Sequence, residues 1–234
     1  MAGEHFFYIS PNQITGNRFT LDTGEGHHAV NVLRLQVDDE IWLVDGVGTA
    51  YKGIITENGR SVTGDILERI PNHAEARITM HLAVGLIKRD RFEWLLEKAV
   101  ECGAASITPL ILDKCVKKSL NMERSQKIVQ AAAKQCGRSL FPGLHEPTTL
   151  DNYLRDRPGV TICLQNTGDI GLANWQMEQS LREVSVMIGP EGDFSENEMD
   201  VIRNNYIDIV TLGSRRLRTE TAAITALNII EYGG

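Results

Sequence analysis

Cysteines and long apolar runs are both scarce in this sequence. The 234 residues include four cysteines, and none of them belongs to a C-x-x-C pair. Neither a zinc site nor a redox motif is indicated, and reduced thiols are expected. No apolar run reaches the roughly 18 residues of a membrane helix, and the start of the chain is not basic. We therefore expect a cytoplasmic protein that contacts no membrane.

Signatures of several large enzyme classes are also absent. The sequence has no P-loop, no H-E-x-x-H and no G-x-S-x-G, and no G-x-G-x-x-G follows an expected strand. We expect no metal site. A nucleotide-like ligand, if there is one, is held without the usual Rossmann loop.

Positive charge is limited, because the net charge is −7. Taken alone, this value argues against nucleic acid as a partner. Residues 114–138, however, hold seven Lys or Arg and a single acid, Glu123. Such a segment can neutralise phosphates locally, although it also suits a solvated helix face.

The first 70 residues are typical of short strands, with turns at Asp45-Gly46 and Asn58-Gly59. One segment, 27–35, suits a short helix instead. We expect a small β-barrel-like domain over residues 1–72. Strands are expected at 6–9, 40–44, 50–55 and 61–67.

From Arg77 the pattern changes to strands that alternate with helices, which predicts an α/β domain over residues 73–234. The β-branched, apolar strand segments fit a parallel sheet buried on both faces. Strands are expected at 78–86, 106–111, 160–164, 184–188 and 207–212. Helices are expected at 91–102, 122–136 and 219–232.

A glycine-rich turn follows the strand at 184–188. Its sequence, Gly189-Pro190-Glu191-Gly192-Asp193-Phe194, leads into Ser195-Glu196-Asn197-Glu198, an S-x-x-E capping box that predicts a helix start. Glycines allow close approach of backbone to a ligand, and ligands of open α/β sheets sit at the carboxyl ends of strands. A tight turn without a ligand is an equally simple interpretation.

Three arginines precede the last expected helix. Arg215, Arg216 and Arg218 follow the strand at 207–212, Thr219 is a candidate helix cap, and Glu220 suits the first turn. A helix N-terminus beside arginines favours anions or nucleic acid. The alternative is a solvated basic loop.

These motifs together resemble RNA methyltransferases of the SPOUT class, and most closely the family that methylates uracil N3 in 16S ribosomal RNA. The resemblance covers nearly the whole chain. Asp193 stands where that family usually has a third glycine, and Arg216 replaces an aliphatic residue. The resemblance to this family rests on the segments 28–34 (HAVNVLR), 97–103 (EKAVECG), 135–138 (QCGR), 189–192 (GPEG) and 217–222 (LRTETA).

The resemblance implies an α/β-knot fold, in which a C-terminal trefoil knot follows an N-terminal PUA-like β-barrel that binds RNA. It implies a homodimer, S-adenosylmethionine as cofactor, and the ribosomal RNA of the small subunit as substrate, methylated in the assembled particle. The implied cofactor-binding residues are Leu164, Gly189, Pro190, Glu191, Gly192, Leu212, Gly213, Leu217 and Arg218.

The resemblance also implies residue roles in catalysis and RNA binding. Arg218 would stabilise negative charge on the uracil, and Glu220 would accept a proton or orient an arginine. Arg34, Lys134, Gln135 and Arg138 would contact RNA. Three alternatives stay open: a related enzyme acting on a ribose 2′-hydroxyl or on tRNA, a non-catalytic RNA-binding module, and a metabolic α/β enzyme with a small ligand.

Overall fold

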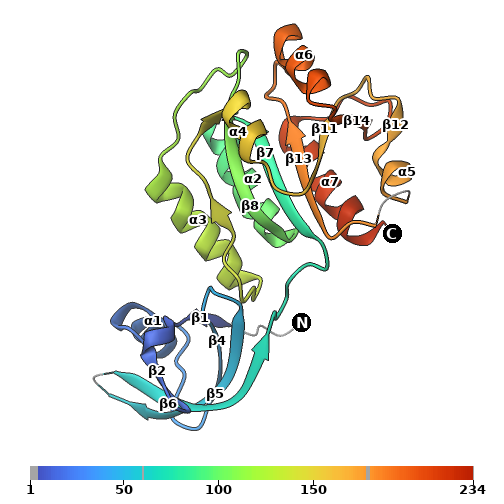
Figure 1. Cartoon of the computed structure of the whole chain (residues 1–234). Coiled ribbons are helices and arrows are strands. Elements are labelled where there is room, and N and C mark those ends of the chain that lie inside the picture. Colours follow the sequence, from blue (N-terminus) through green and yellow to red (C-terminus); the bar gives the residue numbers. More distant parts are fainter. Residues whose placement is uncertain (1–4, 60, 178–179, 234) are drawn as a thin grey trace. The chain divides into compact units, whose positions relative to one another are not determined.

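The computed structural model describes residues 5–59, 61–177 and 180–233. The chain divides into two compact units (Figure 1). One comprises the residues up to Glu75 together with Gln130–Phe141, and the other comprises Ala76–Val129 and the residues from Pro142 onward. No helix among the described residues is both long and apolar enough to cross a bilayer.

The first unit is built on a six-stranded sheet of order β1-β4-β5-β6-β3-β2. Its strands are antiparallel to their neighbours except β1, which runs parallel to β4. The strands expected at 6–9, 40–44, 50–55 and 61–67 are confirmed as β1, β4, β5 and β6. The elements are β1 (Phe6–Tyr8), β2 (Ile14–Thr15), β3 (Arg18–Thr20), α1 (Thr23–His27), β4 (Glu40–Val44), β5 (Thr49–Asn58) and β6 (Val62–Pro71), with a 3-10 turn at Pro11–Gln13 and a π-helical turn at His28–Val32.

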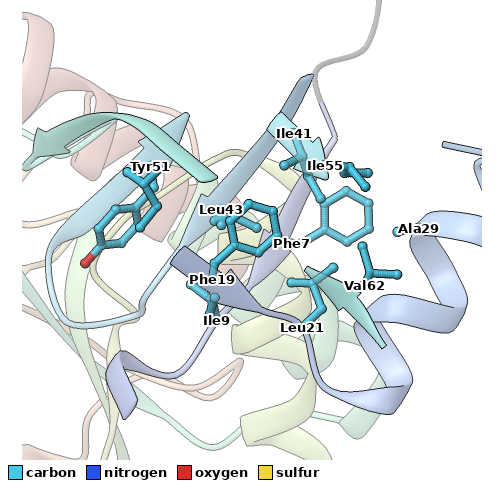
Figure 2. Close-up of a cluster of buried hydrophobic side chains, with 11 residues drawn as sticks. Phe7, Ile9, Phe19, Leu21, Ala29, Ile41, Leu43, Tyr51, Ile55 and Val62 are labelled. Carbon is cyan, nitrogen blue, oxygen red and sulfur yellow. The ribbon is translucent and has the colours of Figure 1, made fainter. Parts of the chain in front are cut away.

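Alternation along these strands produces one apolar core (Figure 2). Phe7, for example, is buried between the half-buried Phe6 and Tyr8. A side chain at Gly64 would place its Cβ 2.5 Å from the ring of Phe19, so glycine lets this ring close the core. The buried cluster comprises Phe7, Ile9, Phe19, Leu21, Ala29, Ile41, Leu43, Tyr51, Ile55, Val62 and Ile66.

The helix expected over 27–35 begins earlier and ends earlier than the sequence pattern predicts. Asp22 stands at the N-cap, where its carboxylate accepts a hydrogen bond from the Glu25 amide at 2.8 Å. The helical segment then closes in the π-helical turn that ends at Val32. Apolar periodicity located this helix, but the cap that starts it lies outside the periodic residues.

The second unit is an eight-stranded sheet in which every described pairing is parallel. The order is β10-β8-β7-β13-β11-β14-β12, with β9 paired to β8. Helices α2 and α7 pack against each other and against β8 and β13 respectively. The elements are β7 (Thr79–Gly85), α2 (Arg89–Glu101), β8 (Ala104–Ile111), β9 (Gly143–Leu144), β10 (Thr148–Thr149), α4 (Leu150–Asp156), β11 (Val160–Leu164), β12 (Ile170–Gly171), α5 (Leu172–Met177), β13 (Glu183–Ile188), α6 (Glu196–Asn204), β14 (Asp208–Thr211) and α7 (Thr219–Tyr232). Helix α3 (Met122–Gln135) is divided between the units, since its residues up to Val129 belong to this unit and those from Gln130 onward to the first.

The predicted parallel sheet is confirmed, but burial on both faces holds for β11 and β13 and not for β14, in which only Val210 is buried. In β13 every residue after Glu183 is buried, and in β11 every residue after Val160 is buried. Leu164 pairs with Ile188, and Ile188 pairs in turn with Val84. Because the strands are parallel and in register, the loops that follow β7, β11 and β13 emerge at the same edge of the sheet.

Candidate functional site

A cavity of about 500 Å³ lies at this edge of the sheet, within the second unit. Four stretches of the chain line it: the connection from β7 to α2, the end of β11, the end of β13, and the segment from β14 to α7. The lining residues are Lys88, Arg91, Leu164, Gln165, Asn166, Ile188, Gly189, Pro190, Glu191, Asp193, Leu212, Arg216, Leu217, Arg218, Thr219 and Ala222. Cavities at the carboxyl ends of α/β strands are the usual ligand sites of such folds.

The loop after β13 is a tight turn held at both ends. The Asp193 amide donates to the carbonyl of Pro190 at 2.9 Å, which closes the turn. The predicted capping box is confirmed, since the Ser195 hydroxyl accepts from the Glu198 amide and the Glu198 carboxylate accepts from the Ser195 amide. Helix α6 therefore starts at a defined residue and anchors the loop.

The backbone of this loop lies close to a neighbouring strand end. A Cβ at Gly85, the last residue of β7, would lie 2.6 Å from both the nitrogen and the Cδ of Pro190. Glycine at this position is what lets the loop sit so close to the sheet. The cavity wall formed by Gly189 and Pro190 is consequently buried and rigidly supported.

The arginine-bearing segment before α7 supplies the opposite wall. Leu212 and Leu217 line the cavity, and Arg218 stands at the N-cap of α7 with an exposed side chain. The expectation that Thr219 caps this helix is wrong. Thr219 is the first helical residue, and its buried hydroxyl donates to the carbonyl of Gly189 at 3.0 Å, joining the two walls.

Arg91, in the first turns of α2, connects the two walls through two carboxylates. Its Nε and Nη2 donate to the two oxygens of Glu220 at 2.8 and 2.6 Å, and its Nη1 donates to Glu191 at 2.9 Å. Burial by itself would raise the pKa of Glu220, but the hydrogen bonds from Arg91 bring it below its usual value. Glu220 is thus held as an arginine-bound carboxylate.

The charges around the cavity are unequal. Lys88, Arg91, Arg216 and Arg218 line it, while Glu191 and Asp193 are the carboxylates among its described lining residues. Arg91 is neutralised by Glu191 and Glu220, which leaves the other cations facing the opening. This balance favours an anionic partner such as a nucleic-acid backbone next to the cavity.

Most residues predicted to bind a cofactor come together here. Leu164, Gly189, Pro190, Glu191, Leu212, Leu217 and Arg218 line the cavity. Gly192 and Gly213 belong to the same loops but lie outside the lining set. Of the two predicted catalytic residues, Arg218 lines the cavity and Glu220 contacts it through Arg91.

The residues predicted to contact RNA belong to the first unit, and two of them are ion-paired there. Arg138 is 3% exposed and donates to Glu75 at 2.6 Å, and Lys134 is paired with Glu25. Gln135 is exposed at the end of α3. Arg34 is exposed as well, in a left-handed conformation (φ 61°) that closes the π-helical segment. The RNA contacts of these four residues stay predictions.

Sequence reasoning did not single out Lys88, Arg91 or Gln165, all of which line the cavity. Arg91 had one available signal, since it opens a helix directly after a buried strand, where ligand sites form in α/β sheets. Gln165 had the same signal, because it is the first residue after β11.

Residues 74–231 match a family model described as an RNA methyltransferase domain, and residues 21–67 match an RNA methyltransferase PUA domain. Ribosomal RNA small subunit methyltransferase E of Synechocystis is 29% identical over 94% of this chain and 74% of its own length. The Bacillus subtilis protein of that name is 28% identical over 97% of this chain and 95% of its own length.

Two solved structures share the fold over nearly their whole length. The ribosomal RNA small subunit methyltransferase E of Neisseria gonorrhoeae, bound to S-adenosyl methionine, has a TM-score of 0.86 at 28% identity and covers 96% of this chain and 95% of its own. A methyltransferase of Legionella pneumophila, in complex with the same cofactor, has a TM-score of 0.84 at 29% identity, with 98% and 97% covered.

Proposed function

Because this chain belongs to the RNA methyltransferase family, with a methyltransferase domain and a PUA domain, we propose that it methylates ribosomal RNA of the small subunit. The methyl donor we propose is S-adenosylmethionine, and the acceptor is N3 of a uridine. The observation that carries the proposal is the cavity at the carboxyl ends of β11, β13 and β14, in a fold whose neighbours are bound to that cofactor.

The residues that line the cavity fit this cofactor. A volume of about 500 Å³ suits a nucleoside with a short charged chain, and Leu212 and Leu217 offer apolar surfaces for an adenine ring. The backbone of Gly189, which lines the cavity, offers hydrogen-bonding groups for its edge. When bound, S-adenosylmethionine supplies a methyl group carried on a positively charged sulfur.

The acceptor needs help from the protein, because neutral uracil N3 carries a proton, has no lone pair ready for attack, and must first lose that proton to solvent water. Arg218 stands exposed at the N-cap of α7 on the cavity wall, where a guanidinium stabilises negative charge that develops on the uracil carbonyls. The N-terminus of α7 adds its dipole with the same sign.

Glu220 acts in this proposal as an orienting group and not as the base. Both of its oxygens accept hydrogen bonds from Arg91, and its pKa is lowered, so it is a poor proton acceptor. Through Arg91 it ties the start of α7 to Glu191 in the glycine loop. The Arg91–Glu220 pair therefore holds Arg218 at a constant position relative to the glycine loop after β13.

The remaining expectations belong to the same proposal. The matched PUA domain and the exposed Arg34 support RNA binding by the first unit. We further propose division into domains at residue 72, a trefoil knot formed by the loops around the cavity, a homodimer, and action in the cytoplasm on the assembled small subunit.

One experiment tests the proposal directly. Purified protein is incubated with methyl-labelled S-adenosylmethionine and small ribosomal subunits from a strain deficient in this methylation, and the RNA is digested to nucleosides. We expect labelled 3-methyluridine. Label in a 2′-O-methylated nucleoside would contradict the N3 assignment, and the absence of any transfer, with free RNA also tried, would contradict the enzymatic function.

A further inference from the structure

Two loops of the cavity wall are joined by a side-chain contact. Gln165 is the first residue after β11, and Asp193 ends the glycine loop after β13. The Gln165 Nε2 donates to the Asp193 Oδ1 at 2.6 Å, and both residues line the cavity. A hydrogen bond from an amide to a carboxylate is charge-assisted and short, so it fixes both partners more firmly than a neutral bond.

The backbone at Asp193 is arranged to present this carboxylate. Its φ is +64°, in the left-handed region that few residues other than Gly, Asn and Asp adopt. The same Oδ1 accepts from the Phe194 amide at 2.8 Å, and the Asp193 amide closes the turn onto Pro190. Gly189 packs against Asp193, with 3.0 Å between its would-be Cβ and Oδ1. The carboxylate is therefore built into the loop that forms the cavity wall.

Gln165 is equally constrained on its own side. Its amide donates to the carbonyl of Val210 at 2.9 Å, which places it next to β14, and its carbonyl accepts from the Gly168 amide. The side-chain Nε2 donates to Asp193 and lies 3.5 Å from the Met199 Sδ, and these two contacts fix the orientation of the side-chain amide.

We propose that the Gln165–Asp193 contact is a latch that positions the cofactor: it couples the loops after β11 and β13 and determines the affinity for S-adenosylmethionine. This inference rests on the proposed function for the identity of the ligand. Asp193 and Gln165 are positioning residues, and neither takes part in methyl transfer itself.

The test uses two variants that break the latch and one that preserves it. Asp193→Gly keeps the left-handed backbone and removes the carboxylate, and Gln165→Met keeps the length of the side chain and removes the donor. Asp193→Asn retains an acceptor oxygen and tolerates the same backbone. The matched control is Asp38→Gly, because Asp38 is an exposed aspartate with φ +74° that belongs to the first unit and is not among the residues that line the cavity.

Calorimetric titration with S-adenosylmethionine and steady-state kinetics on small subunits give the first readout. We expect Asp193→Gly and Gln165→Met each to raise the Kd and KM for the cofactor about five- to tenfold, which is the range of one ordinary hydrogen bond, because the exposure of Asp193 weakens the contribution of its charge. The double variant should bind S-adenosylmethionine no more weakly than the single variant that binds it less well. The kcat and the KM for RNA should stay unchanged. Asp193→Asn should bind within about threefold of the parent protein, and Asp38→Gly equally to it. Additive losses, or no loss, would overturn the latch.

Hydrogen exchange of the ligand-free protein gives the second readout and keeps the two proposals apart. Gln165→Met should speed exchange at residues 189–194, and Asp193→Gly should speed it at residues 165–168. Unchanged exchange in the partner loop would overturn the latch whatever the cofactor does. A parent protein that shows coupled exchange but no binding of S-adenosylmethionine would instead contradict the proposed function alone.

Discussion

Replacing Arg91 by methionine should leave a buried carboxylate without its partner. The Glu220 side chain is 10% exposed and the Arg91 side chain 28%, so water replaces the lost hydrogen bonds poorly. Breaking a buried ion pair by removing one partner costs roughly 3–5 kcal/mol. Because Arg91 is partly exposed, we expect the lower end, about 3 kcal/mol, and a fall in Tm of about 6–12 °C for a chain of this size.

The double variant Arg91→Met/Glu220→Gln separates the cost of the unpaired charge from the loss of packing. The glutamine carries no charge, so its burial costs less, and the double variant should be more stable than Arg91→Met by about 1–2 kcal/mol. Urea unfolding followed by circular dichroism measures all four proteins of the cycle. A double variant that is less stable than Arg91→Met would show that the Arg91–Glu220 ion pair does not stabilise the cavity wall.

The pH dependence of the stability of the same variants tests the direction of the pKa shift of Glu220. In the parent protein the pKa of Glu220 is lowered, so its stabilising contribution is present above the unfolded-state pKa of about 4.3 and is lost as the pH falls. In Arg91→Met the lowering by Arg91 is lost, so the pKa of Glu220 is higher than in the parent protein. The stability gap between the two proteins should therefore be widest near neutral pH and narrow below about pH 4.

Three further predictions concern the cavity and the surface. Arg218→Ala should lower kcat about 100- to 1000-fold, as loss of one charge-stabilising donor does, while calorimetry still detects cofactor binding; near-normal turnover would remove the role of Arg218. Gly85→Ala should push Pro190 outward and weaken cofactor binding, because the new Cβ would lie 2.6 Å from that ring; an unchanged Kd in calorimetry would show that the loop position is irrelevant to binding. The pKa of Glu93 is lowered to about 2, chiefly by hydrogen bonds from its two arginine partners. Glu93→Gln should therefore lower stability at pH 7 and have little effect near pH 2. An equal effect in urea unfolding at both pH values would contradict this prediction.

Local sequence information was sufficient for most of the elements. The Ser195–Glu198 capping box located the start of α6, and the apolar, β-branched segment at 184–188 located a strand buried on both faces. Both signals act within a few residues, through hydrogen bonds and side-chain alternation. The helix at 23–27 shows the limit, since its Asp22 cap lies outside the periodic residues that predicted it.

Composition was a weaker guide to the role of single charges. Arg138 lies in the basic segment 114–138, which suggested contact with phosphate, yet its guanidinium is buried against Glu75. A count of charges cannot show which of them has a partner, because the partner is 63 residues away. Only packing decides whether an arginine faces solvent or a carboxylate.

The sequence by itself determined most of the longer strands and helices, and that two glycine- and arginine-bearing loops follow strand ends. Tertiary structure decided how those loops are held together. Arg91 meets Glu220 across 129 residues and Gln165 meets Asp193 across 28, because the sheet places β13 between β7 and β11. Strand order is set by the packing of the whole sheet, and no local propensity encodes it.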